Sequence, residues 1–238
     1  MYFQTMSNKH VKAISREEII EIDRIALEET GPNLWQMMEN AGRNLAQLTI
    51  NLFGDDLVKK KILALAGKGN NGGGVICAAR HLVNHGINIK LVLADENKLG
   101  EVPQYQKKIF DNAGGLTLSI DDYRSADPDI ILDGIIGYNL NGAPRGILLE
   151  MIKWSNSSSA KIISLDIPSG LDSNTGEAPG EYVHAFATLT LALPKQGLKP
   201  DKTGILYLGD LGIPKETYNK IGIDYISPFG KDYIVKLT

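Results

Sequence analysis

The sequence predicts an α/β domain in which a mainly parallel sheet is covered by helices on both faces and is preceded by two helices. From residue 61 onward, short apolar runs alternate with segments of helical periodicity, which is typical of strands joined by crossover helices. Before residue 55, apolar residues recur only at helical spacing. With 238 residues, 43% of them apolar, the chain is long enough to bury one large core.

The two N-terminal helices are expected over residues 15–31 and 33–54. In the first, Ser15 stands three residues before Glu18, which is the spacing of a capping box, and Gly31 provides a stop. The second carries a single apolar stripe, which we interpret as core packing; its members are Leu34, Met37, Met38, Ala41, Leu45 and Leu48.

The alternating part of the chain predicts seven strands and three helices. The strands are expected over 61–67, 87–95, 116–120, 129–137, 161–168, 187–194 and 204–212, and the helices over 74–86, 102–114 and 144–155. Gly86 closes the first of these helices, and Pro144 lies in the first turn of the last. Right-handed crossovers between such strands make a parallel sheet, and ligands of such sheets bind beyond the carboxyl ends of the strands.

Composition and charge narrow the class of partner. The formal net charge is −3 and the basic residues are spread along the chain, so we expect no nucleic-acid partner. Cys77 is the single cysteine, which excludes an intrachain disulfide and suits a reducing, cytoplasmic location. No apolar run reaches the ~20 residues that span a bilayer, so we expect no membrane partner. We interpret residues 1–12 as a tag remnant and disordered start, and residues 13–238 as a single domain.

A glycine-rich loop follows the first predicted strand. Residues 67–72, GKGNNG, satisfy the pattern G-x-G-x-x-G, and Asp95 ends the next strand, where an acidic residue can bind a ribose. An NAD-dependent dehydrogenase is therefore one hypothesis. A long helical segment before the first strand and the continuation of the loop through Gly73 and Gly74 oppose it. The loop lacks the lysine and hydroxyl residue of a P-loop, and a glycine-rich turn without a ligand is the plainer alternative.

Charged residues end several other predicted strands. Asp133 and Asp166 each follow an apolar run and open a glycine-containing loop, and Lys195 follows the strand over 187–194. Either aspartate alone could simply cap a turn. Both at one edge of a sheet, together with a lysine and a glycine loop, indicate a site with groups for acid–base chemistry.

Four segments occur in a distinctive order after the two helices: GKGNNGGGVICAARHL, DGIIGYNLNGAPRG, SLDIPSGLDSNTG and LTLALPKQGL. In these segments the chain resembles the YjeF N-terminal domain family, whose enzymes are NAD(P)H-hydrate epimerases, over about residues 14–212. The resemblance implies a three-layer α/β/α Rossmann-like fold, often homodimeric. It implies as substrate NADHX or NADPHX, the C6-hydrated forms of NADH and NADPH, whose R and S forms are interconverted. It also implies a functional partnership with a separate ADP- or ATP-dependent dehydratase specific for the S form.

The resemblance further implies which residues form the site. Asp166 would contact the hydrated ring as acid–base group, while Lys195 would hold a phosphate or the ring amide, unless it is an ordinary solvated lysine. A potassium ion is implied at Asn71, Asp133 and Ser169, whose hard oxygen atoms suit such a cation. Two runs would surround the phosphates and ribose: Asn70, Asn71, Gly72, Gly73 and Gly74, and then Gly137, Tyr138, Asn139, Leu140, Asn141, Gly142 and Ala143.

The glycine loop departs from the family pattern G-N-N-G-G-D-G. Gly74 stands at the aspartate position and Val75 at the last glycine position, so a carboxylate is lost and a β-branched residue replaces a glycine that positive φ would favour. This departure leaves open a second class of function, a non-catalytic nucleotide-binding or scaffold module of the same fold. His81 and His85 are four residues apart but lack a third ligand, so we interpret them as ordinary helix residues.

Overall fold

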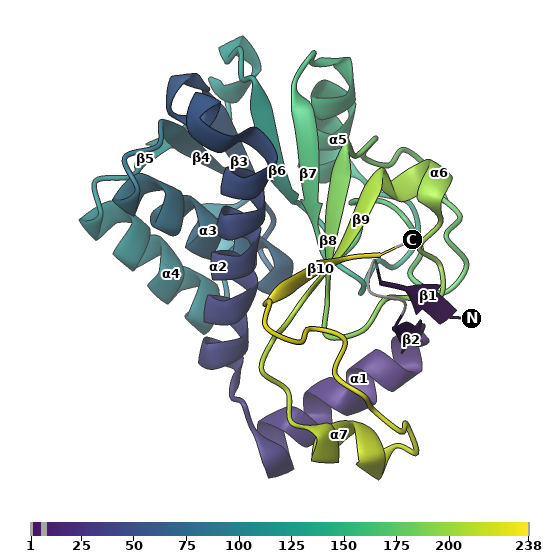
Figure 1. Cartoon of the computed structure of the whole chain (residues 1–238). Helices are drawn as coiled ribbons and strands as arrows, with labels where there is room; N and C mark the ends of the chain where they lie inside the picture. The colour runs from purple at the N-terminus through teal and green to yellow at the C-terminus, as the bar shows by residue number, and fades with distance from the viewer. Residues whose placement is uncertain (1, 6–8, 238) are drawn as a thin grey trace.

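The computed structural model describes residues 2–5 and 9–237, and in that part of the chain the central feature is an eight-stranded sheet (Figure 1). Its order is β10-β9-β8-β7-β6-β3-β4-β5, and every neighbouring pair is parallel except β10 with β9. The strands are β3 (Ile62–Ala66), β4 (Ile89–Leu93), β5 (Leu116–Leu118), β6 (Ile130–Gly134), β7 (Lys161–Leu165), β8 (Ala187–Leu191), β9 (Ile205–Gly209) and β10 (Ile234–Lys236). The prediction of a three-layer α/β/α Rossmann-like fold with a mainly parallel sheet is confirmed.

Helices lie on both faces of this sheet and beyond one end of it. They are α1 (Arg16–Ile25), α2 (Leu34–Phe53), α3 (Asn70–Asn84), α4 (Glu101–Asn112), α5 (Gly146–Ser157), α6 (Pro200–Thr203) and α7 (Lys215–Lys220). Within the described residues, none of the helices combines the length and apolar character that crossing a membrane requires.

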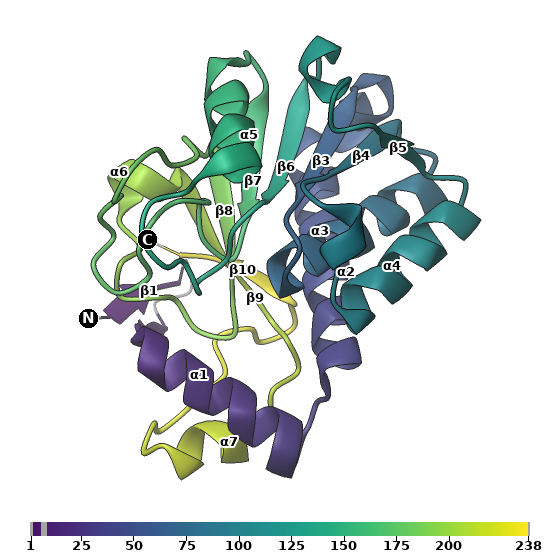
Figure 2. The same ribbon diagram turned by 180° about the vertical axis from the view of Figure 1, so that it is seen from behind.

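Alternate residues of each strand face the two helical layers. In β3, Ile62, Ala64 and Ala66 share one buried cluster with α2 and α3. Leu63 and Leu65 point the other way and share a cluster with α5. The two views of the ribbon show α2 and α3 on one face of the sheet and α5 on the other (Figures 1 and 2). Burial on both faces explains why the strands are continuous apolar runs rather than alternating ones.

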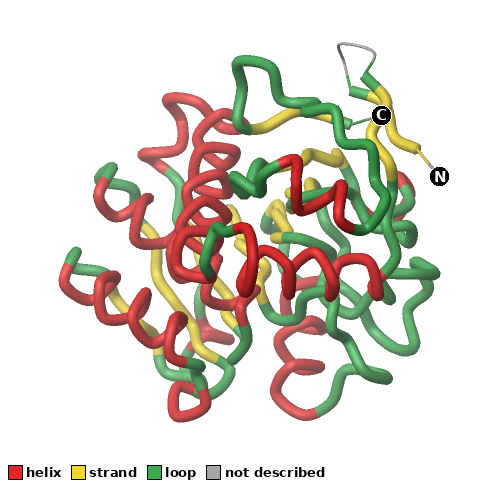
Figure 3. Tube along the Cα trace, turned by 90° about the horizontal axis from the view of Figure 1, so that it is seen from below, coloured by secondary structure: helices red, strands yellow, loops and turns green. Residues whose placement is uncertain are grey.

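The direction in which the sheet grows reverses between β3 and β6. Strands β4 and β5 extend it on one side of β3, whereas β6 to β9 extend it on the other. In open parallel sheets, ligands bind beyond the carboxyl ends of the strands at such a switch point. Helices α1 and α7 lie together beyond that end of the sheet, and a view from below shows helices in front of the strand ends (Figures 1 and 3).

Both predicted N-terminal helices form. The Ser15 side chain accepts from the Glu18 amide and the Glu18 carboxylate accepts from the Ser15 amide, so the predicted capping box is present. A second capping box, of Asn33 with Gln36, begins α2. Helix α1 continues as a π-helical turn over Ala26–Thr30 before Gly31 ends it.

The helix after β3 begins earlier than predicted. It starts at Asn70 rather than residue 74, so the glycines at 72–74 are helical and none has a positive φ. Close packing explains them: a Cβ on Gly72 would overlap the carbonyl of Gly67, and one on Gly73 would lie 2.6 Å from the Met38 sulfur. Glycine is required here because the backbone of Gly67 and the Met38 side chain leave no room for a Cβ, not because the chain turns.

The two ends of the chain are more regular than predicted. Residues 1–12 were expected to be a disordered start, but their described part forms a hairpin of β1 (Tyr2–Gln4) and β2 (His10–Lys12). Residues 1 and 6–8 lie outside the described residues. Phe3 and Val11 are buried in a core cluster that also contains residues of β9 and α7, which explains the order of the hairpin. Strand β10 and the short helices α6 and α7 were not predicted either.

Candidate functional site

A cavity of about 510 Å³ lies beyond the carboxyl ends of β3 and β6, at the switch point of the sheet. Its walls come from α1, α2, the start of α3, and the segments that follow β3, β6, β7 and β8. Eight of the residues expected in the site line it: Asn70, Asn71, Gly72, Gly137, Tyr138, Asn139, Asp166 and Lys195. The strand ends thus bring these eight residues together around one cavity.

Six residues expected around the substrate are not among the described residues that line the cavity: Gly73, Gly74, Leu140, Asn141, Gly142 and Ala143. Gly73 and Gly74 lie on the sides of α3 that pack against α2 and β7. The segment that contains Ala143 runs toward Gly180, where a Cβ would lie 3.2 Å from that of Ala143. The structure therefore brings only the first three residues of each predicted run to the cavity wall.

Asp166 occupies a strained turn immediately after β7. Its φ is +66°, in the left-handed region that side chains other than glycine rarely adopt. The Ile167 amide donates to the Leu165 carbonyl at 2.8 Å, and the Asp166 amide donates to the Leu189 carbonyl of β8 at 2.7 Å. These bonds hold the backbone in an unfavourable conformation that points the carboxylate into the cavity. Backbone strain of this kind clusters at functional sites.

Lys195 is the partner of Asp166. Its ammonium group donates to the Asp166 carboxylate, to the Thr190 hydroxyl at 3.2 Å and to the Leu191 carbonyl at 3.0 Å. The two side chains are only 2% and 7% exposed, so the alternative of a solvated strand-end lysine is wrong. Three acceptors fix the ammonium group, and the result is a buried ion pair on the cavity wall.

Of the three residues expected at a potassium site, Asn71 lines the cavity, whereas Asp133 and Ser169 are fully buried and are not among the described residues that line it. The Asp133 carboxylate accepts from both the hydroxyl and the amide of Ser169, at 2.6 and 3.0 Å, from the Ser164 hydroxyl at 2.7 Å and from the Ile135 amide at 3.1 Å. Burial raises the pKa of Asp133, and these hydrogen bonds act in the opposite direction. Asn71 approaches from α3, and its amide nitrogen is buried without a hydrogen-bond partner in the described part of the chain.

The departure at Gly74 and Val75 leaves the cavity intact. Val75 is helical and fully buried, so the expectation that a positive φ would favour glycine there is wrong. A Cβ on Gly74 would lie 2.5 Å from Cδ2 of Leu165 and 3.9 Å from Cβ of Ala41. The Leu165 side chain therefore fills the space that a side chain at position 74 would need.

Gly74→Asp is expected to destabilise the protein by about 2–5 kcal/mol, because it crowds Leu165 and buries an unpaired carboxylate. Urea unfolding followed by circular dichroism measures the change. Gly74→Ala isolates the crowding, with an expected cost of about 1–3 kcal/mol. The double variant Gly74→Asp with Leu165→Ala should lose less stability than the sum of the two single variants; if Gly74→Asp alone is as stable as the parent, the crowding argument is wrong.

Two further charged residues line the cavity, and neither was predicted from the sequence: Asp23 of α1 and Lys68, which follows β3. The Tyr138 hydroxyl donates to the Asp23 carboxylate at 2.6 Å. Burial raises the pKa of Asp23, and the charge of Asp166 adds to the increase. The sequence does contain a sign of Asp23's position. Asp23 is four residues after Ile19, so it lies on the same face of α1 as the buried apolar residues.

Asp95 does not serve the role that the dehydrogenase hypothesis requires. Its carboxylate accepts from the Asn97 amide and pairs with Lys98 at 2.8 Å, which caps a short 3₁₀ turn. It is not among the described residues that line the cavity. The ribose-binding acidic residue of a dinucleotide fingerprint is therefore not found at this position.

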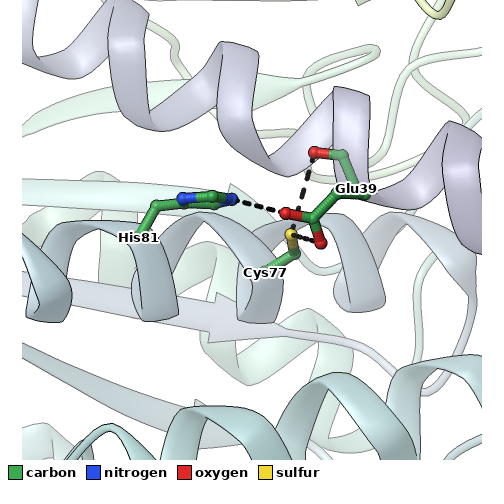
Figure 4. A group of neighbouring side chains, drawn as sticks. All are labelled: Glu39, Cys77 and His81. Carbon is green, nitrogen blue, oxygen red and sulfur yellow. Dashed lines mark hydrogen bonds and ion pairs between the residues drawn. The ribbon is translucent and has the colours of Figure 1, made fainter.

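A second polar cluster joins α2 to α3. Figure 4 shows Glu39, Cys77 and His81 pointing toward one another, and their ligand atoms all lie within 4.8 Å. The Arg80 guanidinium lies among them, 2.6 Å from both Glu39 oxygens and 3.3 Å from the Cys77 sulfur. A cation thus already occupies the place where a metal ion would bind.

The charges of this cluster are consistent with a structural ion pair. The hydrogen bond from His81, with Arg80, holds the pKa of Glu39 well below its usual range. Burial raises the pKa of Cys77 to about 12, so the thiol keeps its proton and is a poor ligand. We interpret the cluster as a link that fixes α3 against α2, and His81 has a structural role there.

The fold and the cavity together define a Rossmann-like domain of the class that binds nucleotides, with a helix N-terminus and a buried carboxylate–lysine pair at the switch point of a parallel sheet. The chain belongs to the family described as YjeF-related protein N-terminus, which matches residues 35–197.

Named relatives cover almost the whole chain. A protein of Dehalogenimonas lykanthroporepellens named NAD(P)H-hydrate epimerase is 48% identical over 237 residues, covering 99% of this chain and 97% of that protein. A bifunctional NAD(P)H-hydrate repair enzyme of Hyperthermus butylicus is 33% identical, and the match covers 89% of this chain but 40% of that protein. The crystal structure of the yeast protein ynu0 (YNL200c) superimposes with a TM-score of 0.85 at 24% identity, covering 95% and 100% of the two chains, which shows the fold.

Proposed function

We propose that this protein is an NAD(P)H-hydrate epimerase, which interconverts the R and S forms of NADHX and NADPHX. The observation that carries the proposal is the buried Asp166–Lys195 pair on the wall of the cavity at the switch point. Relatives that bear this name match the chain over nearly its full length. No observation favours the alternative of a non-catalytic scaffold module, since the residue that suggested it, Gly74, lies outside the cavity wall.

The cavity offers complementary surfaces for a hydrated nicotinamide nucleotide. Helix α3 begins at the cavity, and no side chain caps its N-terminus at Gly69, so its first amide groups are available to a phosphate. Lys68 adds a positive charge at the same place. Met37 and Met38 of α2 give an apolar wall, which suits the uncharged ring of a reduced nicotinamide.

Asp166 supplies acid–base chemistry at the C6 hydroxyl. Departure of the hydroxyl, or opening of the ring, builds positive charge, and a carboxylate within reach stabilises that charge. Lys195 contributes by holding the carboxylate in one orientation. The strained turn and the Lys195 ammonium group together fix the Asp166 carboxylate before the substrate binds.

A coupled assay tests the function. A mixture of R and S NADPHX is incubated with an S-specific dehydratase and its nucleotide in potassium buffer, and recovery of NADPH is followed by absorbance. The dehydratase alone should stall when the S form is consumed. If this protein is added and recovery continues to completion, the function is supported; if recovery still stalls while the folded protein binds NADPH, the scaffold reading replaces it.

Potassium is proposed as the cofactor, held by Asn71, Asp133 and Ser169. The donor set fits a hard cation, because Asn71 offers an amide oxygen, Asp133 a carboxylate and Ser169 a hydroxyl. The Ser169 hydroxyl has a second acceptor, the Ile136 carbonyl at 3.0 Å, so donating there leaves an Asp133 oxygen available to an ion. The Asn71 side-chain nitrogen supports the proposal as well, because it has no hydrogen-bond partner among the described residues. Flipping the amide group would put its oxygen, a potassium ligand, where the nitrogen now lies. The ion would join three loops and position the substrate.

Potassium is expected to raise the melting temperature relative to tetramethylammonium at equal ionic strength. At ten times its Kd the gain is about 1.4 kcal/mol. Ser169→Ala should abolish the response, whereas Ser157→Ala, on the exposed face of α5, should keep it. An equal response of the two variants to potassium would contradict the site.

Three further properties are proposed from the resemblance to the family. The second repair step is performed by a separate ADP- or ATP-dependent dehydratase; relatives named bifunctional are more than twice as long as the part that matches this chain. The protein acts as a homodimer. Its location is cytoplasmic, where the reduced cofactors are used.

A further inference from the structure

The cavity contains a second acidic group that the chemistry above does not use. Asp23 projects from α1, which lies beyond the strand ends, whereas Asp166 projects from the sheet itself. Figures 1 and 2 both show α1 crossing beyond the end of the sheet. The two carboxyl groups therefore belong to different walls of one cavity.

Asp23 is held in place by a dedicated hydrogen bond. Tyr138, which follows β6, donates its hydroxyl proton to Oδ2 of Asp23 at 2.6 Å, and both residues line the cavity. The geometry thus resembles the arrangement of Asp166 with Lys195, in which a second side chain fixes a carboxylate. One difference matters: the partner of Asp166 is a cation, and the partner of Asp23 is neutral.

The surroundings of Asp23 disfavour its charged form. Burial and the nearby Asp166 raise the pKa of Asp23, and the Tyr138 bond and Lys195 only partly offset this. The burial of Tyr138 and the charge of Asp23 raise the pKa of that hydroxyl, so it remains a donor. One carboxyl group is thus held by a neutral hydroxyl and the other by a cation, and such a difference between the surroundings of two carboxyl groups is what acid–base catalysis uses.

When the C6–O bond breaks, inversion at C6 calls for two such groups. The hydroxyl leaves from one face of the ring and water adds to the other, and a single carboxylate on one wall reaches one face. We propose that Asp23, positioned by Tyr138, is the second catalytic acid–base group and serves the ring face opposite to Asp166. The inference rests on the proposed function.

The reaction balances with these two groups alone. The Asp23 carboxyl gives its proton to the C6 hydroxyl, the C6–O bond breaks with both electrons on oxygen, and water leaves. The N1 lone pair forms an N1=C6 double bond, which places the positive charge on the ring. Water then attacks C6 from the other face, loses a proton to the Asp166 carboxylate, and the electron pair returns to N1. The net result is inversion and transfer of one proton from Asp23 to Asp166, and the reverse direction exchanges their roles.

An oxygen-exchange experiment distinguishes the roles of Asp23 and Asp166 at the two faces of the ring. Each NADPHX epimer is incubated in H₂¹⁸O with potassium and with the parent protein, the Asp23→Asn variant or the Asp166→Asn variant. The two epimers are then separated, and their ¹⁸O content is measured by mass spectrometry. The parent should invert C6 with incorporation of ¹⁸O. Asp23→Asn should lose inversion by at least ~100-fold yet still exchange oxygen, with retention, in one epimer only. Asp166→Asn should do the same in the other epimer.

The controls distinguish a catalytic role from a structural one. Glu21→Gln changes an exposed carboxylate of the same helix, which pairs with Arg24, and should behave as the parent. Tyr138→Phe should reduce inversion less than Asp23→Asn, because the carboxyl group remains. Melting curves and NADPH binding establish that each variant is folded, and the reaction without protein gives the spontaneous rate.

The possible outcomes distinguish failure of the proposed function from failure of the inference about Asp23. If the parent does not invert C6 at all, the proposed function itself fails. If the parent inverts C6 without ¹⁸O uptake, the C6–O bond stays intact and the inference is overturned while the function stands. Full inversion by Asp23→Asn overturns it, and so does joint loss of inversion and exchange in both epimers by a folded Asp23→Asn that binds NADPH. Reciprocal exchange with retention supports it.

Discussion

Replacing Asp166 with asparagine is expected to lower the rate of NAD(P)HX epimerisation by about 10²–10⁴-fold, because the carboxylate that stabilises the charged ring is lost. Asparagine keeps the size of the side chain and tolerates the left-handed backbone, so the strained turn persists. The rate is measured in the coupled assay with the dehydratase in excess. NADPH binding should change little.

The matched control for this variant is Asp201→Asn, which alters an exposed aspartate in α6. It should keep the parent rate. An Asp166→Asn protein that keeps the parent rate would mean that the buried pair only stabilises the fold, and the proposed role of Asp166 in the chemistry would be wrong.

Replacing Lys195 with methionine is expected to lower the free energy of unfolding by about 3–5 kcal/mol, because the Asp166 carboxylate then remains buried without its cation. The double variant Asp166→Asn with Lys195→Met removes both charges and should recover much of that loss. Urea unfolding of the parent, the two single variants and the double variant completes a mutant cycle.

Lys199→Met provides the comparison for an exposed ion pair. Lys199 is 40% exposed and pairs with Glu177 at 2.8 Å, so its loss should cost no more than about 1 kcal/mol. Similar losses for Lys195→Met and Lys199→Met would show that burial adds nothing to the Asp166–Lys195 pair, contrary to the structure.

The sheet was predictable because its strands are buried on both faces. A run such as that of β3 has no polar residue to interrupt it, and the helices between such runs impose parallel neighbours. The same logic located the site, since Asp133, Asp166 and Lys195 all follow apolar runs. What the sequence does not encode locally is β10, an antiparallel edge strand of three residues that depends on pairing with β9.

The cavity was only partly predictable because proximity in a sequence run does not mean exposure to the cavity. Asn70 and Gly72 face it, yet Gly73 and Gly74 rotate away within the same helical turn. The start of α3 was misplaced because glycine indicates a turn in isolation, whereas here it permits backbone contact with Gly67. Asp23 was missed because an acidic residue in a helix is usually solvated, whereas the packing of α1 beyond the strand ends leaves this one half-buried.

The left-handed backbone of Asp166 also bears on how this domain can diverge. A residue kept for its carboxylate here carries a conformational penalty, of the order of 1 kcal/mol, that glycine would not incur. If a descendant no longer needed the reaction, selection for stability would favour glycine at this position only after Lys195 had also been replaced, because the buried ammonium group would otherwise lose its partner. Positions 166 and 195 are therefore expected to change together in lineages that have lost the reaction.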